Sequence, residues 1–186
     1  MTKIYIDFDG VILDTWEVIF KKYYEEFNTT DIKEDNIKKI MLTIGWNYIL
    51  ENSKEINYSL EKIKRISKTH DICILTKINS KQEQDAKTNF LLENKIKKMC
   101  FVPYTSSKTQ YVDPHNNILI DDDIKNLEEW EQHGGIAIFF NKDLNNYDSY
   151  GNKNNKFVII NDLFAKSNAD CQLKNRLIAK KSCYLH

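Results

Sequence analysis

The chain has 186 residues, and 27 Lys and Arg side chains balance 27 Asp and Glu side chains. This length suits one well-cored domain with a small insertion and is short for two ordinary domains. The balanced charge gives no indication of a nucleic acid polymer, a membrane surface or an acidic polymer as a partner. A basic-then-apolar leader and an apolar run of about eighteen residues are both missing. We therefore expect a cytoplasmic protein that does not bind membranes.

The four cysteines are far apart and form no CxxC pair: Cys73, Cys100, Cys171 and Cys183. Two of them lie within apolar runs, where a reduced, buried thiol is the default state. This cysteine usage agrees with a reducing compartment.

The segment 4–14, IYIDFDGVILD, begins as a short, apolar, β-prone run that leads into two aspartates. Asp7 and Asp9 have alternate spacing, and Gly10 follows at once. Like charges held so close are costly unless a cation or a shifted pKa relieves them. Parallel sheets bind ligands outside the carboxyl ends of their strands. We therefore expect a strand that carries a metal site at its end, and the alternative is an Asp-Gly turn after an edge strand.

The next segment has helical periodicity, with Trp16, Ile19, Tyr23 and Phe27 at three- and four-residue spacings. Polar residues 28–31 interrupt it, and further helical sequence continues to Leu50. About forty residues are too many for a simple crossover connection. We therefore predict a small helical cap at 15–57, inserted into an α/β core formed by 1–14 and 58–186.

The rest of the chain alternates helical and strand-like runs. A helix begins at Ser59, and another, opened by a Ser80–Glu83 capping box, presents Ala86, Phe90 and Leu91 to the core. A helix after Asp123 ends at Gly134-Gly135, where glycine suits a left-handed terminus. The predicted strands are 71–76, 99–102, 117–120, 136–140 and 157–160. The residues between 141 and 155 are expected to form a loop, and the tail from Leu163 a helix with a solvated basic face.

This alternation predicts a parallel sheet covered by helices on both faces. Acidic or hydroxyl residues then end three of its strands, at Asp7, Thr76 and Asp121. They would gather in one crevice, where carboxylates could hold Mg²⁺ together with a phosphorylated substrate. One carboxylate of an Asp-x-Asp pair could attack phosphorus while the other moves a proton. Thr76 and Lys108 could contact the phosphoryl group.

Four motifs in order resemble those of the haloacid dehalogenase-like (HAD) hydrolases. They are Asp7 to Asp14, Leu75-Thr76, Lys108 and Ile120-Asp121-Asp122. Within this superfamily, Leu119 to Asp122 followed by Asn126-Leu127, Trp130 and Gly134-Gly135 is most similar to the 5′(3′)-deoxyribonucleotidase group, the cytosolic type C 5′-nucleotidases. The resemblance implies a Rossmann-like sheet with strand order 5-4-1-2-3.

The resemblance also implies a Mg²⁺-dependent phosphatase. Asp7 would form an aspartyl-phosphate, and Asp9 would protonate the leaving group and then activate water. The implied metal ligands are Asp7, Asp9 through its backbone carbonyl, Asp121 and Asp122. Thr76, Lys108, Phe8 and Lys77 would bind the phosphoryl group.

Three details qualify the likeness. Val11 stands where many relatives have threonine. Lys81 is an alternative source of the positive charge assigned to Lys108. Asp123 is expected to cap a helix rather than to bind metal.

We expect the cap to set substrate specificity. Its candidates for stacking on a nucleobase are Trp16, Phe20, Tyr24, Trp46 and Tyr48. An aromatic stripe at helical spacing is more often part of a core. The favoured substrate is a (deoxy)nucleoside monophosphate, and the alternatives are a sugar phosphate or other small metabolite, or a non-catalytic metal- or nucleotide-binding regulatory protein. A homodimer is left open.

Overall fold

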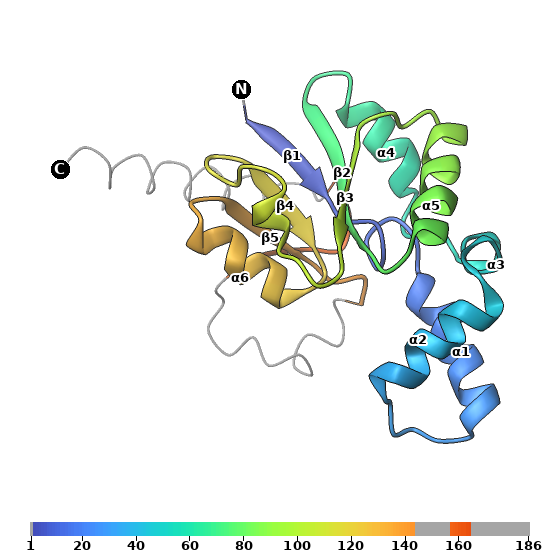
Figure 1. Cartoon of the computed structure of the whole chain (residues 1–186). Helices are drawn as coiled ribbons and strands as arrows, with labels where there is room; N and C mark the ends of the chain where they lie inside the picture. The colour runs from blue at the N-terminus through green and yellow to red at the C-terminus, as the bar shows by residue number, and fades with distance from the viewer. Residues whose placement is uncertain (1, 144–156, 165–186) are drawn as a thin grey trace.

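The computed structural model describes residues 2–143 and 157–164, and its centre is a six-stranded parallel sheet (Figure 1). The strand order is β3-β2-β1-β4-β5-β6, so the predicted order is confirmed and a sixth strand extends one edge. The strands are β1 (Lys3–Ile6), β2 (Asp71–Ile78), β3 (Met99–Pro103), β4 (Ile118–Asp121), β5 (Ile136–Phe140) and β6 (Val158–Ile160). The helices are α1 (Thr15–Phe27), α2 (Glu34–Ile44), α3 (Trp46–Asn52), α4 (Ser59–Ile66), α5 (Lys81–Glu93) and α6 (Ile124–Gln132), with a 3-10 turn, η1 (Lys108–Gln110).

β1 lies in the middle of the sheet and pairs with β2 on one side and β4 on the other. Ile6 is in register with Ile74 and with Ile120. The N–H of Asp7 continues the β4 ladder, donating to the carbonyl of Ile120 at 2.9 Å. The chain positions that follow Ile6 and Ile120 are therefore held at the same end of the sheet, as expected for neighbouring parallel strands.

Each face of the sheet packs against helices because successive strand residues point to opposite sides. One cluster joins strand residues such as Ile6 and Ile74 to Ile63 of α4 and Leu91 of α5. The opposite cluster includes Tyr5 and Leu119, together with Leu127 and Trp130 of α6. The rings of Trp130 and Tyr5 meet in a T-shaped arrangement with centroids 5.3 Å apart. The α/β layering that the sequence predicted is confirmed.

Some element ends differ from the sequence predictions. β2 does not close at Thr76 but continues to Ile78, because Lys77 and Ile78 still pair with Val102 and Pro103 of β3. β3 accordingly includes Pro103, whose missing N–H is tolerated on an edge strand. Gly134 has φ +81° just after α6, as the Gly-Gly stop predicted. The predicted loop beyond residue 143 and the basic tail beyond 164 lie outside the described residues.

The first three helices pack on one another and stand beside the sheet (Figure 1). The two connections to this group run alongside each other, since Asp14 N–H donates to the Lys54 carbonyl at 2.9 Å and Ile56 N–H to the Ile12 carbonyl at 3.0 Å. Asp14 also caps α1 by accepting from the N–H of Glu17. The helical group thus has the position expected of a cap, and the division into cap and core stays a prediction.

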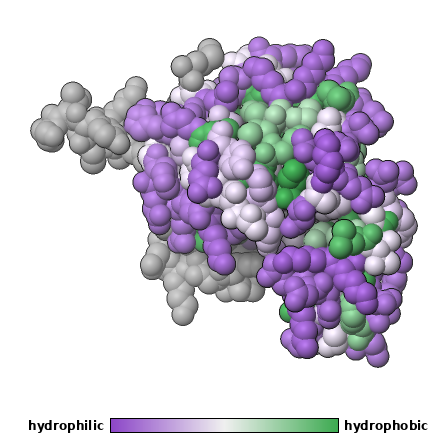
Figure 2. Space-filling view, in the orientation of Figure 1, coloured by the Kyte–Doolittle hydropathy of each residue, from purple (hydrophilic) through white to green (hydrophobic). Residues whose placement is uncertain are grey.

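The exposed surface is mainly hydrophilic on the face seen in Figure 2, with a hydrophobic area where the α1–α3 group meets the rest of the molecule. None of the helices in the described ranges has the length and apolar character needed to span a membrane. Cys73 and Cys100 are half-buried free thiols on adjacent strands. Burial, with Cys100 adding to it, raises the pKa of Cys73 to about 11, so this group is a neutral thiol at physiological pH.

Candidate functional site

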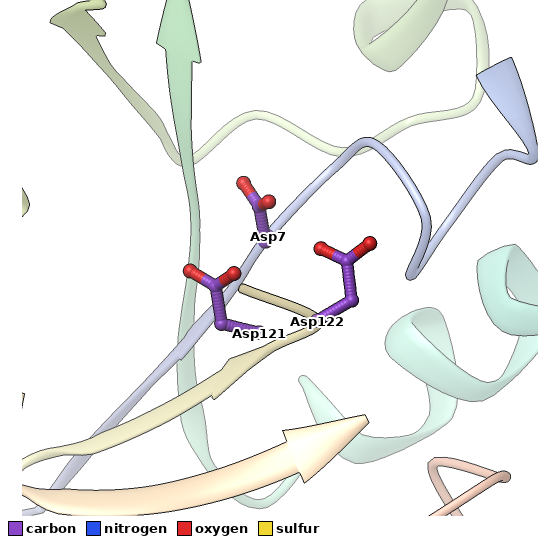
Figure 3. A group of neighbouring side chains, drawn as sticks. All are labelled: Asp7, Asp121 and Asp122. Atoms are coloured by element: carbon purple, nitrogen blue, oxygen red, sulfur yellow. The ribbon is translucent and has the colours of Figure 1, made fainter. Parts of the chain in front are cut away.

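Three carboxylates meet at the carboxyl ends of β1 and β4 (Figure 3). Asp7, Asp121 and Asp122 each offer an oxygen, and these atoms lie within 4.8 Å of one another. Asp121 is completely buried and Asp7 nearly so. An all-oxygen donor set of carboxylates is the kind that Mg²⁺ prefers. The residues therefore fit a magnesium site.

Lys108 is the cation of this cluster. Its Nζ lies 2.7 Å from Oδ2 of Asp121 and 2.8 Å from Oδ1 of Asp7, and its side chain is almost completely buried. The contact with Asp7 lacks hydrogen-bond geometry, so this buried oxygen keeps an acceptor site for a ligand. Burial alone lowers the pKa of Lys108, but Asp121 and Asp7 raise it above its ordinary value. Lys108 is therefore a fixed positive charge.

One lysine does not neutralise three carboxylates. Burial raises the pKa of Asp121 to about 7, with Lys108 opposing the shift and Asp7 adding to it. Burial and the charges of Asp121 and Asp7 raise the pKa of Asp122 well above its usual range. Without a further cation, part of this cluster holds protons near neutral pH, and a divalent cation would displace them.

The carboxylate of Asp9 lies outside this cluster. Its Oδ1 accepts a hydrogen bond from the Thr15 hydroxyl at 2.8 Å, and its Oδ2 accepts one from Lys87 Nζ at 2.5 Å. Asp7 and Asp9 nevertheless line the same cavity. The two aspartates of the first motif are thus in different electrostatic surroundings.

The sequence interpretation missed Lys87, and it assigned Glu83 only to a capping box with Ser80, where the Glu83 N–H does donate to the Ser80 hydroxyl. Both side chains are buried, and Lys87 Nζ lies 2.7 Å from Oε1 of Glu83 one helical turn earlier. The available signal was the i, i+4 spacing of a charge pair next to Ala86 and Phe90, on the inner face of α5. Thr15, which anchors Asp9 from the start of α1, was also missed.

Gly10 allows Asp122 to approach the turn that follows β1. Its φ is +72°, and a Cβ added there would lie 2.0 Å from Oδ2 of Asp122. Glycine is therefore needed at this position for two reasons. The backbone is left-handed, and the Asp122 carboxylate occupies the space that a side chain would take.

A cavity of about 220 Å³ opens over Asp7 and Asp9, between the sheet ends and the α1–α3 group. The helices contribute an apolar wall, which consists of Trp16, Ile19, Met41 and Trp46. The core contributes polar groups, which include Lys77, Asn79, Tyr104, Lys108 and Asn126. The cavity is thus polar near Asp7 and Asp122, where a metal ion could bind, and aromatic on the side formed by the helices.

Of the five aromatic residues predicted to contact a base, only Trp16 and Trp46 line this cavity. Phe20 stacks on Trp16 at 5.6 Å, and Tyr24 follows Phe20 at 6.4 Å along α1, which directs this stripe away from Asp7. Phe20 lines a neighbouring cavity instead. Tyr48 also lies outside this cavity, and its ring contacts Lys22, whose ammonium is 5.8 Å from the ring centroid.

The predicted phosphate-binding residues differ in whether they line the cavity. Lys77 and Lys108 line the cavity. Thr76 is buried, and its hydroxyl accepts from Lys87 Nζ at 3.3 Å and donates to the Lys77 carbonyl. The Phe8 ring is buried and packs edge-on against Phe90, so only its backbone could reach a phosphate.

The structure also places the other residues that the sequence singled out as alternatives or excluded from the site. Lys81 pairs with Asp85 on the exposed side of α5, at 2.7 Å, so it does not supply the charge found at Lys108. Asp123 caps α6 by accepting from the N–H of Lys125, as predicted. His70, His115 and His133 are exposed, and His186 lies outside the described residues.

Solved structures with the same architecture identify the fold. A haloacid dehalogenase-like family hydrolase from Xanthomonas campestris has a TM-score of 0.62 at 11% identity, covering 95% of this chain and 97% of that one. The chain has the HAD-like fold. D,D-heptose 1,7-bisphosphate phosphatase from Burkholderia thailandensis has a TM-score of 0.55 at 14% identity, covering 93% and 99%. The magnesium-bound HAD-hydrolase YfnB from Bacillus subtilis has a TM-score of 0.54 at 13% identity, covering 87% and 95%.

Comparisons of sequence add nothing to this assignment, since no family model and no curated protein matches the chain. The likeness therefore extends over the whole HAD-like fold at low identity, and the activity has to be argued from the site itself.

The raised pKa of Asp121 predicts a pH-dependent effect of Mg²⁺ on stability. The native carboxyl holds its proton up to about pH 7, whereas an unfolded Asp loses it near pH ~3.9. The native state thus binds more protons in this window, and without metal the free energy of unfolding falls as the pH rises through it. Mg²⁺ offsets the negative charge that deprotonation leaves on the buried carboxyl, so its increase of Tm should be larger at pH 8 than at pH 5.

Thermal unfolding in EDTA and in excess MgCl₂ at pH 5, 6, 7 and 8 measures this effect. Asp121→Asn should weaken the pH dependence because an amide does not titrate. An equal Mg²⁺-induced shift of Tm at all four values would contradict the assignment of the cluster.

Gly10→Ala should weaken Mg²⁺ binding by at least about tenfold, because the new methyl group displaces the Asp122 carboxylate. Titration calorimetry with MgCl₂ measures the affinity. Gly45→Ala is the matched control: Gly45 has a similar φ of +75°, but its added Cβ would meet only Gln82 at 3.9 Å. Equal affinities of the two variants would show that the contact with Asp122 is unimportant.

Proposed function

We propose that the protein is a Mg²⁺-dependent phosphomonoester hydrolase that acts through an aspartyl-phosphate. The observation that carries the proposal is the meeting of Asp7, Asp121 and Asp122 at the carboxyl ends of β1 and β4. Lys108 contacts Asp7 and Asp121, and Asp9 is held separately in the same cavity. Mg²⁺ bound to these carboxylates would offset the charge of a phosphate ester. The HAD-like fold of the chain agrees with this chemistry.

Asp7 is the nucleophile in this proposal. Its carboxylate would attack phosphorus and displace the ester oxygen, so one P–O bond forms as another breaks. Lys108 holds one oxygen of Asp7 and would attract the phosphoryl oxygens. Lys77, whose side chain also faces the cavity, could share that role.

Asp9 is the proton carrier. It would give a proton to the leaving alcohol oxygen and later take one from the water that hydrolyses the aspartyl-phosphate. Its separation from the carboxylate cluster supports this division, since an acid–base group and a nucleophile need different surroundings.

For the substrate we propose a (deoxy)nucleoside monophosphate. Trp16 and Trp46 give the cavity two indole rings, and stacking on a base contributes about 1–3 kcal/mol in binders of single-stranded nucleic acids. The second candidate is a sugar phosphate, which the similarity to a heptose bisphosphate phosphatase favours.

Asp7→Asn should lower phosphate release by at least about 10³-fold, because the amide is a poor nucleophile. The measurement is Mg²⁺-dependent release of inorganic phosphate from nucleoside and deoxynucleoside 5′-monophosphates. Asp71→Asn is the control, since Asp71 pairs with Lys98 and Lys3 at the other end of the sheet. Equal turnover by wild type and Asp7→Asn would rule out the aspartyl-phosphate route.

Trp16→Ala should separate the two substrate classes. If a base stacks on this ring, kcat/KM for a deoxynucleoside 5′-monophosphate should fall by roughly 5- to 150-fold while that for ribose 5-phosphate changes little. Tyr48→Ala is the control, because Tyr48 is similarly exposed and lies outside the cavity. Parallel losses for both substrates, or faster wild-type turnover of the sugar phosphate, would favour the second candidate.

A further inference from the structure

Lys87 is a buried cation to which the proposed function gives no role. Its Nζ contacts Oδ2 of Asp9 at 2.5 Å, Oε1 of Glu83 at 2.7 Å, Oγ1 of Thr76 at 3.3 Å and the carbonyl oxygen of Lys77 at 3.4 Å. Its side chain has no exposed area. The ammonium therefore has polar partners on every donor and no contact with solvent.

Glu83 holds Lys87 in place. Its Oε2 accepts from the backbone N–H of Asn79 at 2.8 Å, and its own N–H donates to Ser80 at the start of α5. Glu83 is thus fixed in the first turn of the helix, and Lys87 lies one turn later on the same face. A buried lysine that is anchored twice in this way has little freedom to rotate.

The fixed lysine in turn limits the Asp9 carboxylate. Lys87 holds one of its oxygens, and the Thr15 hydroxyl holds the other at 2.8 Å. These two partners come from α5 and α1, so they fix the plane of the carboxylate between the core and the α1–α3 group. Displacement of a reacting group by about 1 Å can cost 10²-fold in rate.

Lys87 also contacts the aromatic side of the cavity. Its Nζ lies 4.6 Å from the ring of Trp46 on α3 and 5.2 Å from the ring of Phe8. Trp46 lines the cavity beside Trp16. The same ammonium therefore touches the proposed proton carrier and a wall of the proposed substrate cavity.

We propose that Lys87 is a positioning residue, which orients the Asp9 carboxylate for proton transfer to the leaving group. This inference rests on the proposed phosphatase function. Lys87 would not touch the phosphoryl group, since Lys108 is the lysine beside Asp7. The competing explanation is that Lys87 only neutralises the buried Glu83.

The two explanations differ in how the effect depends on the leaving group. The alkoxide of an alkyl phosphate needs a proton as it leaves, whereas p-nitrophenolate departs without one. kcat/KM reports the steps up to the first phosphoryl transfer. An orienting role in proton donation should therefore affect an alkyl ester more than an aryl ester, and a loss of structural integrity should affect both equally.

The experiment compares kcat/KM for a deoxynucleoside 5′-monophosphate and for p-nitrophenyl phosphate in Lys87→Met. Because this change leaves Glu83 buried without its partner, the double variant Lys87→Met/Glu83→Gln is measured as well. Lys81→Met is the matched control on the same helix, since Lys81 forms an exposed i, i+4 pair. Calorimetric Mg²⁺ affinity provides a readout that does not depend on turnover.

We expect both Lys87 variants to lose at least about tenfold more kcat/KM on the nucleotide than on the aryl ester, with Mg²⁺ affinity within about twofold of wild type. Equal losses on the two esters, or a gain on the nucleotide, would overturn the inference and leave the proposed function intact. A wild type that hydrolyses neither ester would overturn the proposed function, and the inference with it.

Discussion

The carboxylates at one end of the sheet are the constraint on which the site depends. Parallel pairing of β1 with β4 brings Asp7 and Asp121 together, and the short turn at Gly10 allows Asp122 to join them. Buried like charges at this separation are unfavourable unless cations offset them. Lys108 offsets part of the charge. The remaining negative charge would favour a divalent cation in the crevice, so the proposed metal site depends on the strand order.

The acidic residues of the first motif are arranged as two units rather than one. Asp7 belongs to the cluster with Lys108, and Asp9 belongs to a second network with Lys87 and Thr15. Each unit has a buried lysine from a different part of the chain. This separation reduces the direct repulsion between the two aspartates and lets their surroundings be set independently. This arrangement suits the proposed roles of Asp7 as nucleophile and Asp9 as proton carrier within one cavity.

The sheet could be predicted from sequence because its signals are local. Apolar runs such as 72–75 and acidic residues at strand ends are readable along the chain, and the rule for parallel sheets places those ends together. Lys108 was proposed because the crowded carboxylates call for a cation and it lies just upstream of the fourth strand, and the resemblance to the HAD motifs indicated the same residue. The extension of β2 to Ile78 was missed because it depends on pairing with β3, which sequence alone does not register.

The hydrogen-bond network around Asp9 could not be predicted from the helical periodicity of the sequence. A lysine on the inner face of an otherwise amphipathic helix is read as an exception to the pattern, and only the fold reveals that Asp9, 78 residues earlier, lies opposite it. The same applies to the aromatic stripe of α1, where Trp16, Phe20 and Tyr24 share a helical spacing but only Trp16 reaches the cavity. Spacing determines which side chains share a face, whereas packing against α3 and the sheet end determines which part of that face meets the site. Residues that act through another residue are therefore the ones for which the structure is indispensable.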